Sequence, residues 1–338
     1  MNDFLELYGQ CYYHRFEIRM IAADDIVFDA WTGAIIRNNL LYAADKVMLA
    51  KQSKTLREQI DTFPFKETHP LYKELKDGFP KGYVLTDFSH YDIQSSPVSI
   101  KKNEIFSFAL ILIGNFCEYK SYFFQAIRLM CERGLGKPQT PFLLLDIAEQ
   151  SLSGESQIMA VAQTDLSQQL LYPVRLTDFT QKDEPDEFSE ILVRYLTPVM
   201  LFRLKNKKNT QLSYQDKCNR FPSFYQLTRS ALFRLQKLYT IYISDEEYYP
   251  ALYDSELIET YLENAGHLLL QSTNMQYITL KNTQKKGKVN DMPLAGYVGE
   301  QVYSGYFRKY PALLQFMAEM GVGNETVYGM GKYEVKVK

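Results

Sequence analysis

Cysteine is scarce in this chain, and its placement excludes two kinds of small fold. The four cysteines lie far apart in the sequence, and no two of them form a C-x-x-C pair. Zinc ribbons and disulfide frameworks both need closely or regularly spaced cysteines. We therefore expect neither, and the pattern fits a protein of the reducing cytoplasm.

Long apolar runs and targeting signals are also missing. The most apolar stretch, residues 105–116, is too short to span a bilayer and is typical of a buried strand. The opening MNDFLELYGQ has neither the basic nor the apolar region of a secretory signal peptide. We therefore expect no membrane contact.

The sequence has no strong excess of charge and no phosphate-binding fingerprint. A net charge of -2 argues against a non-specific nucleic-acid binder, although a local basic groove remains compatible with it. Neither a Walker motif nor G-x-G-x-x-G opens a helix after a strand. No acidic cluster has the spacing of metal ligands, so we expect no metal and no cofactor.

Aromatic residues, in contrast, are abundant. The chain holds 26 Tyr and 21 Phe among its 338 residues, a length that predicts two domains with a core each. Most of these rings belong in such cores. Any that are exposed could stack against nucleobases.

The first half of the chain alternates between strand and helix signals. In order, we expect a strand at 14–20, a helix capped by Thr32, strands near 83–88 and 105–113, a helix over about 119–133, and a strand at 142–148. This order, β-α-β-β-α-β, is that of the ferredoxin-like unit.

The second half repeats the order. The expected elements are a strand near 191–202, a helix near 223–242, strands near 276–280 and 295–303, a helix from Pro311 and a strand from Val327, with an inserted helical segment over 244–272. The fold class is therefore α+β, with two tandem ferredoxin-like domains. We place them at residues 1–150 and 189–338, with a linker over 151–188.

A short echo supports duplication of this unit. At an offset of 187, MCERGLG at 130–136 falls on MAEMGVG at 317–323. Both copies place a glycine pair between the second helix and the last strand. Glycine lets a backbone approach a ligand closely and can leave N–H groups for phosphates.

Short motifs recur along the chain: GAIIR at 33–37, GLG at 134–136, YLTP at 195–198 with the helix after it, and GYVG at 296–299 with GVG at 321–323 and GMG at 329–331. On these motifs the chain resembles the CRISPR-associated repeat-RNA endoribonucleases of the RAMP superfamily. These motifs follow the family's order over most of the chain.

The resemblance implies metal-independent cleavage, in which a 2′-hydroxyl attacks the neighbouring phosphate. Such a reaction needs a base, an acid, and cations around the developing charge. Family members often place a His or Tyr on the first helix, but here Ile36 stands where one such Tyr would be. No His occurs between Arg37 and Lys54. The catalytic candidates are therefore His69, Tyr42, Lys51 and Arg37.

The resemblance also implies that the glycine-rich loop lies against RNA. The predicted RNA contacts are Gly321, Gly323, Gly329, Gly331, Lys332, Arg229, Arg234, Lys285 and Lys286. The first four could equally form a structural turn between a helix and a strand. The arginines could be an ordinary charged helix face, and the two lysines a solvated loop.

Three functions stay open at this level. The first is an endoribonuclease that binds CRISPR repeat RNA and cuts it to give guide RNAs. The second is a non-catalytic RAMP subunit that holds guide RNA among other effector subunits, an alternative that the missing helix-one histidine supports. A more distant third is a small-nucleotide binder that uses residues 321–331.

Overall fold

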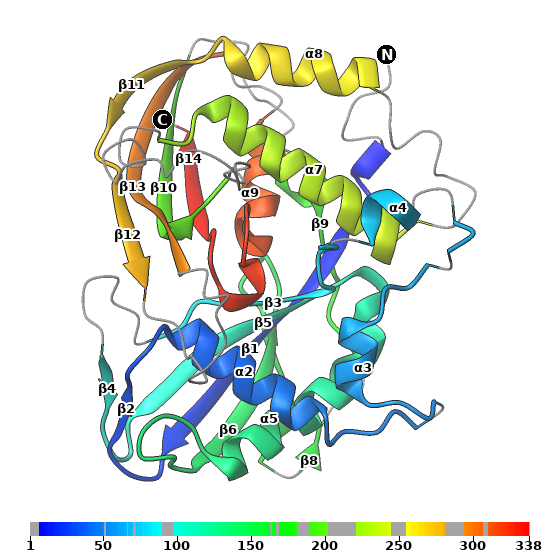
Figure 1. Ribbon diagram of the computed structural model, residues 1–338, viewed down its shortest axis with the longest axis vertical. Coiled ribbons are helices and arrows are strands. Elements are labelled where there is room, and N and C mark those ends of the chain that lie inside the picture. Colours follow the sequence, from blue (N-terminus) through cyan, green and yellow to red (C-terminus); the bar gives the residue numbers. More distant parts are fainter. Residues whose placement is uncertain are drawn as a thin grey trace, which may run out of the picture.

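The computed structural model describes residues 7–50, 52–65, 67–69, 72–76, 78–89, 97–162, 164–166, 169–180, 189–201, 221–244, 255–280, 294–306 and 310–337. Each half of the chain forms a sheet with helices packed against it, and the two halves lie one above the other (Figure 1).

The lower half of Figure 1 is built around strand β1, Tyr12–Ala22. Its Phe16, Ile18 and Met20 are buried, as their alternation predicts. The sheet order is β3-β5-β1-β6-β7-β8, and β9 also pairs with β1. The other strands are β2 (Ile26–Phe28) and β4 (Val98–Ile100), which pair separately, and β3 (Tyr83–Thr86), β5 (Ile105–Ile113), β6 (Phe142–Gln150), β7 (Ser156–Val161), β8 (Thr164–Asp165) and β9 (Val174–Arg175).

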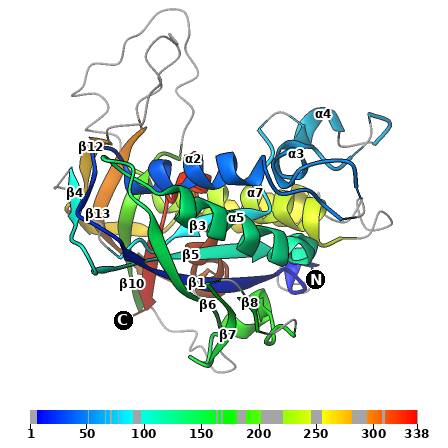
Figure 2. The same ribbon diagram turned by 90° about the horizontal axis from the view of Figure 1, so that it is seen from below.

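Two helices cover one face of this sheet side by side (Figure 2). They are α2, Thr32–Ala44, and α5, Lys120–Arg133, which ends at Gly134. The first half of the chain also forms shorter helices: α3 (Leu56–Asp61), α4 (Tyr72–Leu75), η1 (Gly114–Tyr119) and η2 (Leu176–Phe179). The central order β3-β5-β1-β6 is that of a ferredoxin-like sheet, as the sequence predicts.

The upper half repeats this arrangement. Its sheet has the order β11-β13-β10-β14, and β12 pairs with β13 farther along that strand. The elements are β10 (Ser189–Val199), α7 (Phe224–Tyr242), α8 (Ser255–Gly266), β11 (Leu269–Thr273), β12 (Gln276–Leu280), β13 (Leu294–Gly305), α9 (Pro311–Met320), η4 (Thr326–Tyr328) and β14 (Tyr333–Val337). The prediction of two tandem ferredoxin-like units is confirmed.

The two halves share one hydrophobic core. The rings of Tyr13 and Phe316 lie 5.5 Å apart across the boundary. Gln236 of α7 donates a hydrogen bond of 3.0 Å to the Tyr8 hydroxyl. The Tyr242 hydroxyl, at the end of α7, donates to the carbonyl oxygen of Pro80 at 2.9 Å. Buried contacts therefore fix how the halves sit relative to each other.

Several local predictions are wrong. Thr32 is the first buried residue of α2 rather than its cap, because Trp31 holds the N-cap position without a side-chain bond. Residues 269–272, the end of the expected helical insertion, instead belong to an exposed edge strand, since short apolar runs do not separate helix from strand. The last strand begins at Tyr333 instead of Val327, because Gly329 and Gly331 have φ of 74° and 76°.

The segment expected as a linker is partly structured. Strands β7, β8 and β9 fall within residues 151–188 and extend the lower sheet. Among the residues that the structure describes, no helix has the length and hydrophobicity needed to cross a membrane.

Candidate functional site

The glycine-rich loop between α9 and β14 packs so closely against its neighbours that several of its positions leave no room for a side chain. Gly321, Gly323, Gly329 and Gly331 have φ between 71° and 79°, the left-handed region that favours glycine. A Cβ at position 331 would lie 1.9 Å from the carbonyl oxygen of Val322. These positions therefore need glycine for reasons internal to the protein.

The N–H groups of three of these glycines are already occupied. Gly323 donates to the Ser230 hydroxyl at 3.1 Å, Gly329 to the Thr326 carbonyl oxygen at 3.0 Å, and Gly331 to that of Pro198 at 2.9 Å. The expectation that these three N–H groups are free for phosphate is therefore wrong. That the glycines contact RNA in another way stays a prediction.

The same loop docks onto the start of α2 in the lower half. The Trp31 indole donates a hydrogen bond of 2.6 Å to the carbonyl oxygen of Tyr328. A Cβ on Gly33 would lie 1.9 Å from that oxygen. On the loop's other side, a Cβ on Gly329 would meet the Phe88 ring at 2.5 Å. The GAIIR motif thus touches Tyr328, the residue before the GMG motif, across the boundary.

Arg37 projects from α2 into this junction. Its guanidinium carbon lies 4.4 Å from the centre of the Tyr328 ring, and Nη1 donates to the Tyr328 hydroxyl at 3.0 Å. The Nε atom is buried without a hydrogen-bond partner. Burial raises the pKa of the neighbouring Tyr83, and the Arg37 charge opposes that rise. Arg37 therefore brings a partly unsatisfied cation to the boundary between the halves.

Lys81 adds an ammonium beside Arg37. Its Nζ lies 3.5 Å from Oδ1 of Asp61, and Nε of Arg57 contacts the other carboxylate oxygen, Oδ2, at 2.5 Å. Burial lowers the pKa of Lys81; Asp61 opposes this shift, whereas Arg37 and Arg57 add to it. A lysine in such a setting releases its proton more readily than a solvated one. Lys81, Arg37, Arg57 and Asp61 are called the Lys81 cluster below.

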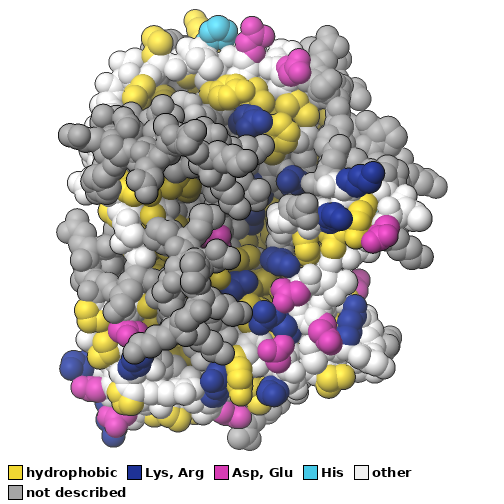
Figure 3. Space-filling view, in the orientation of Figure 1, with side chains coloured by type: hydrophobic (Ala, Val, Ile, Leu, Met, Phe, Trp, Pro, Cys, Tyr) yellow, Lys and Arg dark blue, Asp and Glu magenta, His cyan; other side chains and the backbone are white. Residues whose placement is uncertain are grey.

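The helix α7 brings another cation toward the same boundary. The Nε and Nη2 atoms of Arg234 are buried, with no hydrogen-bond partner in the part of the chain that the structure describes, and burial lowers the pKa of this guanidinium to about 10. Tyr242 opposes that shift, and its hydroxyl binds Pro80, the residue before Lys81. In Figure 3, Lys and Arg side chains follow the hollow between the two halves. The arrangement forms a basic cleft.

Two other catalytic candidates, Tyr42 and His69, pack against aromatic or cationic neighbours of their own. Tyr42 is 46% exposed, and the Arg133 guanidinium stacks 3.6 Å above its ring. Five residues turn a helix by about 140° beyond a full circle, so Tyr42 and Arg37 point in different directions. The His69 ring stacks on Phe65 at 4.0 Å. Lys51 lies outside the described residues, as do Lys285 and Lys286.

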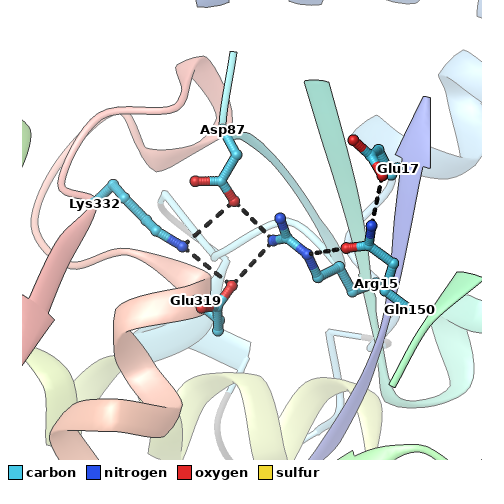
Figure 4. A network of polar contacts seen from close by, with 6 residues as sticks. All are labelled: Arg15, Glu17, Asp87, Gln150, Glu319 and Lys332. Atoms are coloured by element: carbon cyan, nitrogen blue, oxygen red, sulfur yellow. Dashed lines mark hydrogen bonds and ion pairs between the residues drawn. The ribbon is translucent and has the colours of Figure 1, made fainter. Parts of the chain in front are cut away.

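Of the remaining cations predicted to contact RNA, one is exposed and one is buried. Arg229 lies on the open face of α7, with its guanidinium 4.9 Å from the Phe233 ring centre. Lys332, at 8% exposure, instead joins the ion network of Figure 4. Its Nζ lies 3.1 Å from Glu319 and 3.5 Å from Asp87.

Arg15 completes this network from β1. Its Nη1 contacts Asp87 at 2.7 Å and Glu319 at 3.1 Å, so two cations and two anions alternate across the boundary (Figure 4). Burial alone would raise the pKa of Asp87, but Lys332 and Arg15 outweigh it and hold that pKa below its ordinary value. The network therefore joins β1 and β3 to α9 and β14.

Sequence reasoning found Arg37 but missed Lys81, Arg57 and Tyr328. Lys81 stands in a Pro-Lys-Gly stretch that reads as an ordinary turn. Its partners come from α2 and α3, and no local pattern announces them. Within the described ranges, no group of three or more His, Cys, Asp or Glu side chains is placed to hold a metal ion.

Comparisons with known proteins agree with this architecture. The family model of the CRISPR-associated endoribonuclease Cas6 matches residues 193–333, and one described as an N-terminal domain matches residues 10–171. Among solved structures, a Cas6 product complex is similar at 12% identity and a TM-score of 0.55, covering 96% of this chain and 99% of that one. No curated protein sequence matches.

A second solved structure places a similar chain in a larger assembly. It is a partial Cas6-RT-Cas1–Cas2 complex, similar at 12% identity with a TM-score of 0.58. The alignment covers 98% of this chain and 47% of that one. At such identity these likenesses bear on the fold alone.

Proposed function

We propose that this chain is a Cas6-type protein that cuts the CRISPR transcript within each repeat, because residues 193–333 match the family model of the CRISPR-associated endoribonuclease Cas6. The observation that carries the proposal is the Lys81 cluster at the basic cleft. It supplies a lysine whose pKa is lowered by burial and which has two arginine neighbours, and such a lysine gives up its proton more readily than a solvated one.

The reaction we propose is attack of a 2′-hydroxyl on the adjacent phosphate. The new bond joins the 2′-oxygen to phosphorus, and the bond to the 5′-oxygen breaks, which leaves a cyclic phosphate and a 5′-hydroxyl. Lys81 donates the proton that the leaving 5′-oxygen takes up. Arg37 and Arg57 stabilise the charge on the phosphorane, as positioned cations do in such transition states. His69 and Tyr42 stay candidates for the base.

The proposed substrate is the repeat RNA, bound along the cleft between α2 and α7. Arg37 and Arg234 both have buried nitrogen atoms without hydrogen-bond partners, and phosphate oxygens would satisfy them. Because the contacts are ionic, affinity should fall steeply as salt rises.

The first test is cleavage of end-labelled repeat RNA from the protein's own locus, in excess EDTA. A matched RNA carries a 2′-deoxy residue at the cut position. We expect one cut in EDTA and none in the deoxy RNA. A cut that needs added metal, or that survives the deoxy substitution, would contradict 2′-hydroxyl attack without metal.

A lysine pair tests the role of Lys81. Lys81→Met removes the proposed acid, and we expect the single-turnover rate to fall by about 10²–10⁴-fold. Lys102→Met is the matched control, because it removes the same charge from an exposed turn. Repeat affinity should change far less than the rate. A Lys81→Met protein that cuts at the wild-type rate would exclude Lys81 as the acid.

A specific observation supports the non-catalytic alternative. His14 forms a buried pair with Glu149, at 2.5 Å, and His69 stacks on Phe65, so neither is part of the Lys81 cluster. Under this alternative the protein holds guide RNA and co-purifies with other effector subunits. Tight binding of repeat RNA without any cut would favour it.

A further inference from the structure

A cavity of about 310 Å³ lies in the upper half, at the opposite end of α7 from Tyr242. Its walls come from the residues that open α7, from the end of α8, and from β11 and β13. The helix of 19 residues spans roughly 28 Å at 1.5 Å per residue, so the cavity is separate from the Lys81 cluster. We call it the Gln301 pocket.

The pocket has a polar floor in an apolar setting. Gln301, on β13, is 1% exposed, and among the described residues neither its Oε1 nor its Nε2 has a hydrogen-bond partner. Leaving such a buried amide unpaired is unfavourable, because it loses its bonds to water and gains none in return. The walls beside it are aromatic and aliphatic, including Phe221, Phe224 and Leu268. Gln301 thus places a buried donor and a buried acceptor beside the pocket, neither of them paired within the described part of the chain.

The walls are flat and held in place. The Phe224 and Tyr303 rings lie 5.2 Å apart, and the Tyr303 hydroxyl donates to the carbonyl oxygen of Pro222 at 3.1 Å. The rim is open, with Tyr225 and Leu270 at 39% and 47% exposure. Rigid aromatic walls around a paired donor and acceptor suit a planar ring whose edge carries the complementary pair.

A nucleobase has this shape and this edge. Glutamine pairs with adenine through two hydrogen bonds, to the N6 amino group and the neighbouring ring nitrogen. The volume lies at the small end of the range of about 300–1,000 Å³ for ligand pockets, which fits one base and excludes a base-paired stem. We propose that the Gln301 pocket binds a single unstacked adenine.

The adenine belongs to the bound RNA if the proposed function holds, and this clause of the inference rests on that function. An adenine held here while the Lys81 cluster engages the cut site would fix the register of the strand. The pocket would therefore contribute to the choice of sequence, and the cleft to the chemistry.

Free nucleotides test the pocket without any assumption about RNA. Binding of AMP and UMP to the full chain is followed by ligand-observed NMR. We expect AMP to bind more tightly than UMP, and Gln301→Leu to weaken AMP about tenfold, the equivalent of roughly 1.4 kcal/mol. Gln276→Leu, an exposed glutamine on neighbouring β12, is the control and should change nothing.

Repeat RNA then identifies the source of the base. Each adenine is replaced in turn by purine riboside, which lacks the N6 amino group. We expect one position to lose about tenfold in affinity, and the loss to vanish in Gln301→Leu. AMP binding without such a position would assign the pocket to a free adenine nucleotide.

The inference and the proposed function can fail separately. Wild-type protein that cuts repeat RNA while Gln301→Leu keeps wild-type affinity for every RNA and for AMP would overturn the inference, and the pocket would hold only water. Protein that binds AMP through Gln301 but never binds repeat RNA would overturn the function alone. Urea unfolding of Gln301→Leu shows that the variant is folded, since removing an unpaired buried amide should not destabilise it.

Discussion

Alanine in place of Gly33 should loosen the contact between α2 and the glycine-rich loop, which links the two halves. The added Cβ would stand 1.9 Å from the carbonyl oxygen of Tyr328 and 2.7 Å from the Trp31 Nε1 atom. Carbon and oxygen atoms in close contact lie about 3.3 Å apart, so α2 and the loop must separate by about 1.4 Å. That movement breaks the 2.6 Å hydrogen bond between Trp31 and Tyr328.

The magnitude follows from three opposing effects. Overpacking costs about 1–3 kcal/mol, and the lost hydrogen bond about 1 kcal/mol. Alanine favours the helix over glycine by at most about 1 kcal/mol. The net destabilisation is therefore about 1–3 kcal/mol, and the loop carrying Tyr328 should shift away from Arg37.

Urea unfolding measures the loss of stability, and single-turnover cleavage measures the effect of moving the Tyr328 loop away from Arg37. We expect Gly33→Ala to lower the unfolding midpoint with little change in slope. Gly266→Ala is the control, because the nearest atom to its new Cβ is 3.9 Å away, on Tyr225. Equal midpoints for Gly33→Ala and the wild type would refute the steric argument.

Two further predictions concern charge and thiols. Asp87→Asn removes the charge, and asparagine tolerates the φ of 51° at this position. We expect it to lower the free energy of unfolding by about 1–2 kcal/mol at neutral pH, a modest loss because the Asp87 side chain is 34% exposed. Because the pKa of Asp87 is lowered in the folded protein, its contribution to stability is complete above about pH 4 and is lost as the pH falls through that lowered pKa. A difference in stability between Asp87→Asn and the wild type that persists in acid would contradict this. Burial raises the pKa of Cys117 and of Cys131 to about 12, so peptide mapping after maleimide treatment should find both unlabelled until urea unfolds the protein.

The order of elements could be predicted because each signal is local. The helix from Pro311 starts where a proline fits the first turn, and α7 starts after Ser223, whose hydroxyl accepts from the Gln226 N–H in a capping box. The alternation of apolar and polar residues predicted which face of β1 is buried. These features depend on neighbours within a few residues, and the sequence displays them directly.

The site could not be predicted in the same way, because its parts meet only in the folded chain. Lys332 follows a glycine and reads as an exposed cation, yet its carboxylate partners come from β3's end and from α9. Lys81 reads as a turn residue, yet the cations beside it stand on α2 and α3. Burial and long-range charge decide both roles, and neither leaves a local pattern.

The fit of the glycine-rich loop separates the architecture from the chemistry. Gly33, Gly329 and Gly331 are required where one backbone passes against another, and none of them transfers a proton. Such glycines are needed for the two halves to pack together, whether or not the cleft beside them can cut RNA. The proposed acid Lys81 is thus separable from this contact, whereas Arg37 takes part in both, because it donates to the Tyr328 hydroxyl. An engineer could move the acid within the cleft, or remove it to obtain a pure RNA binder, and leave the docking untouched.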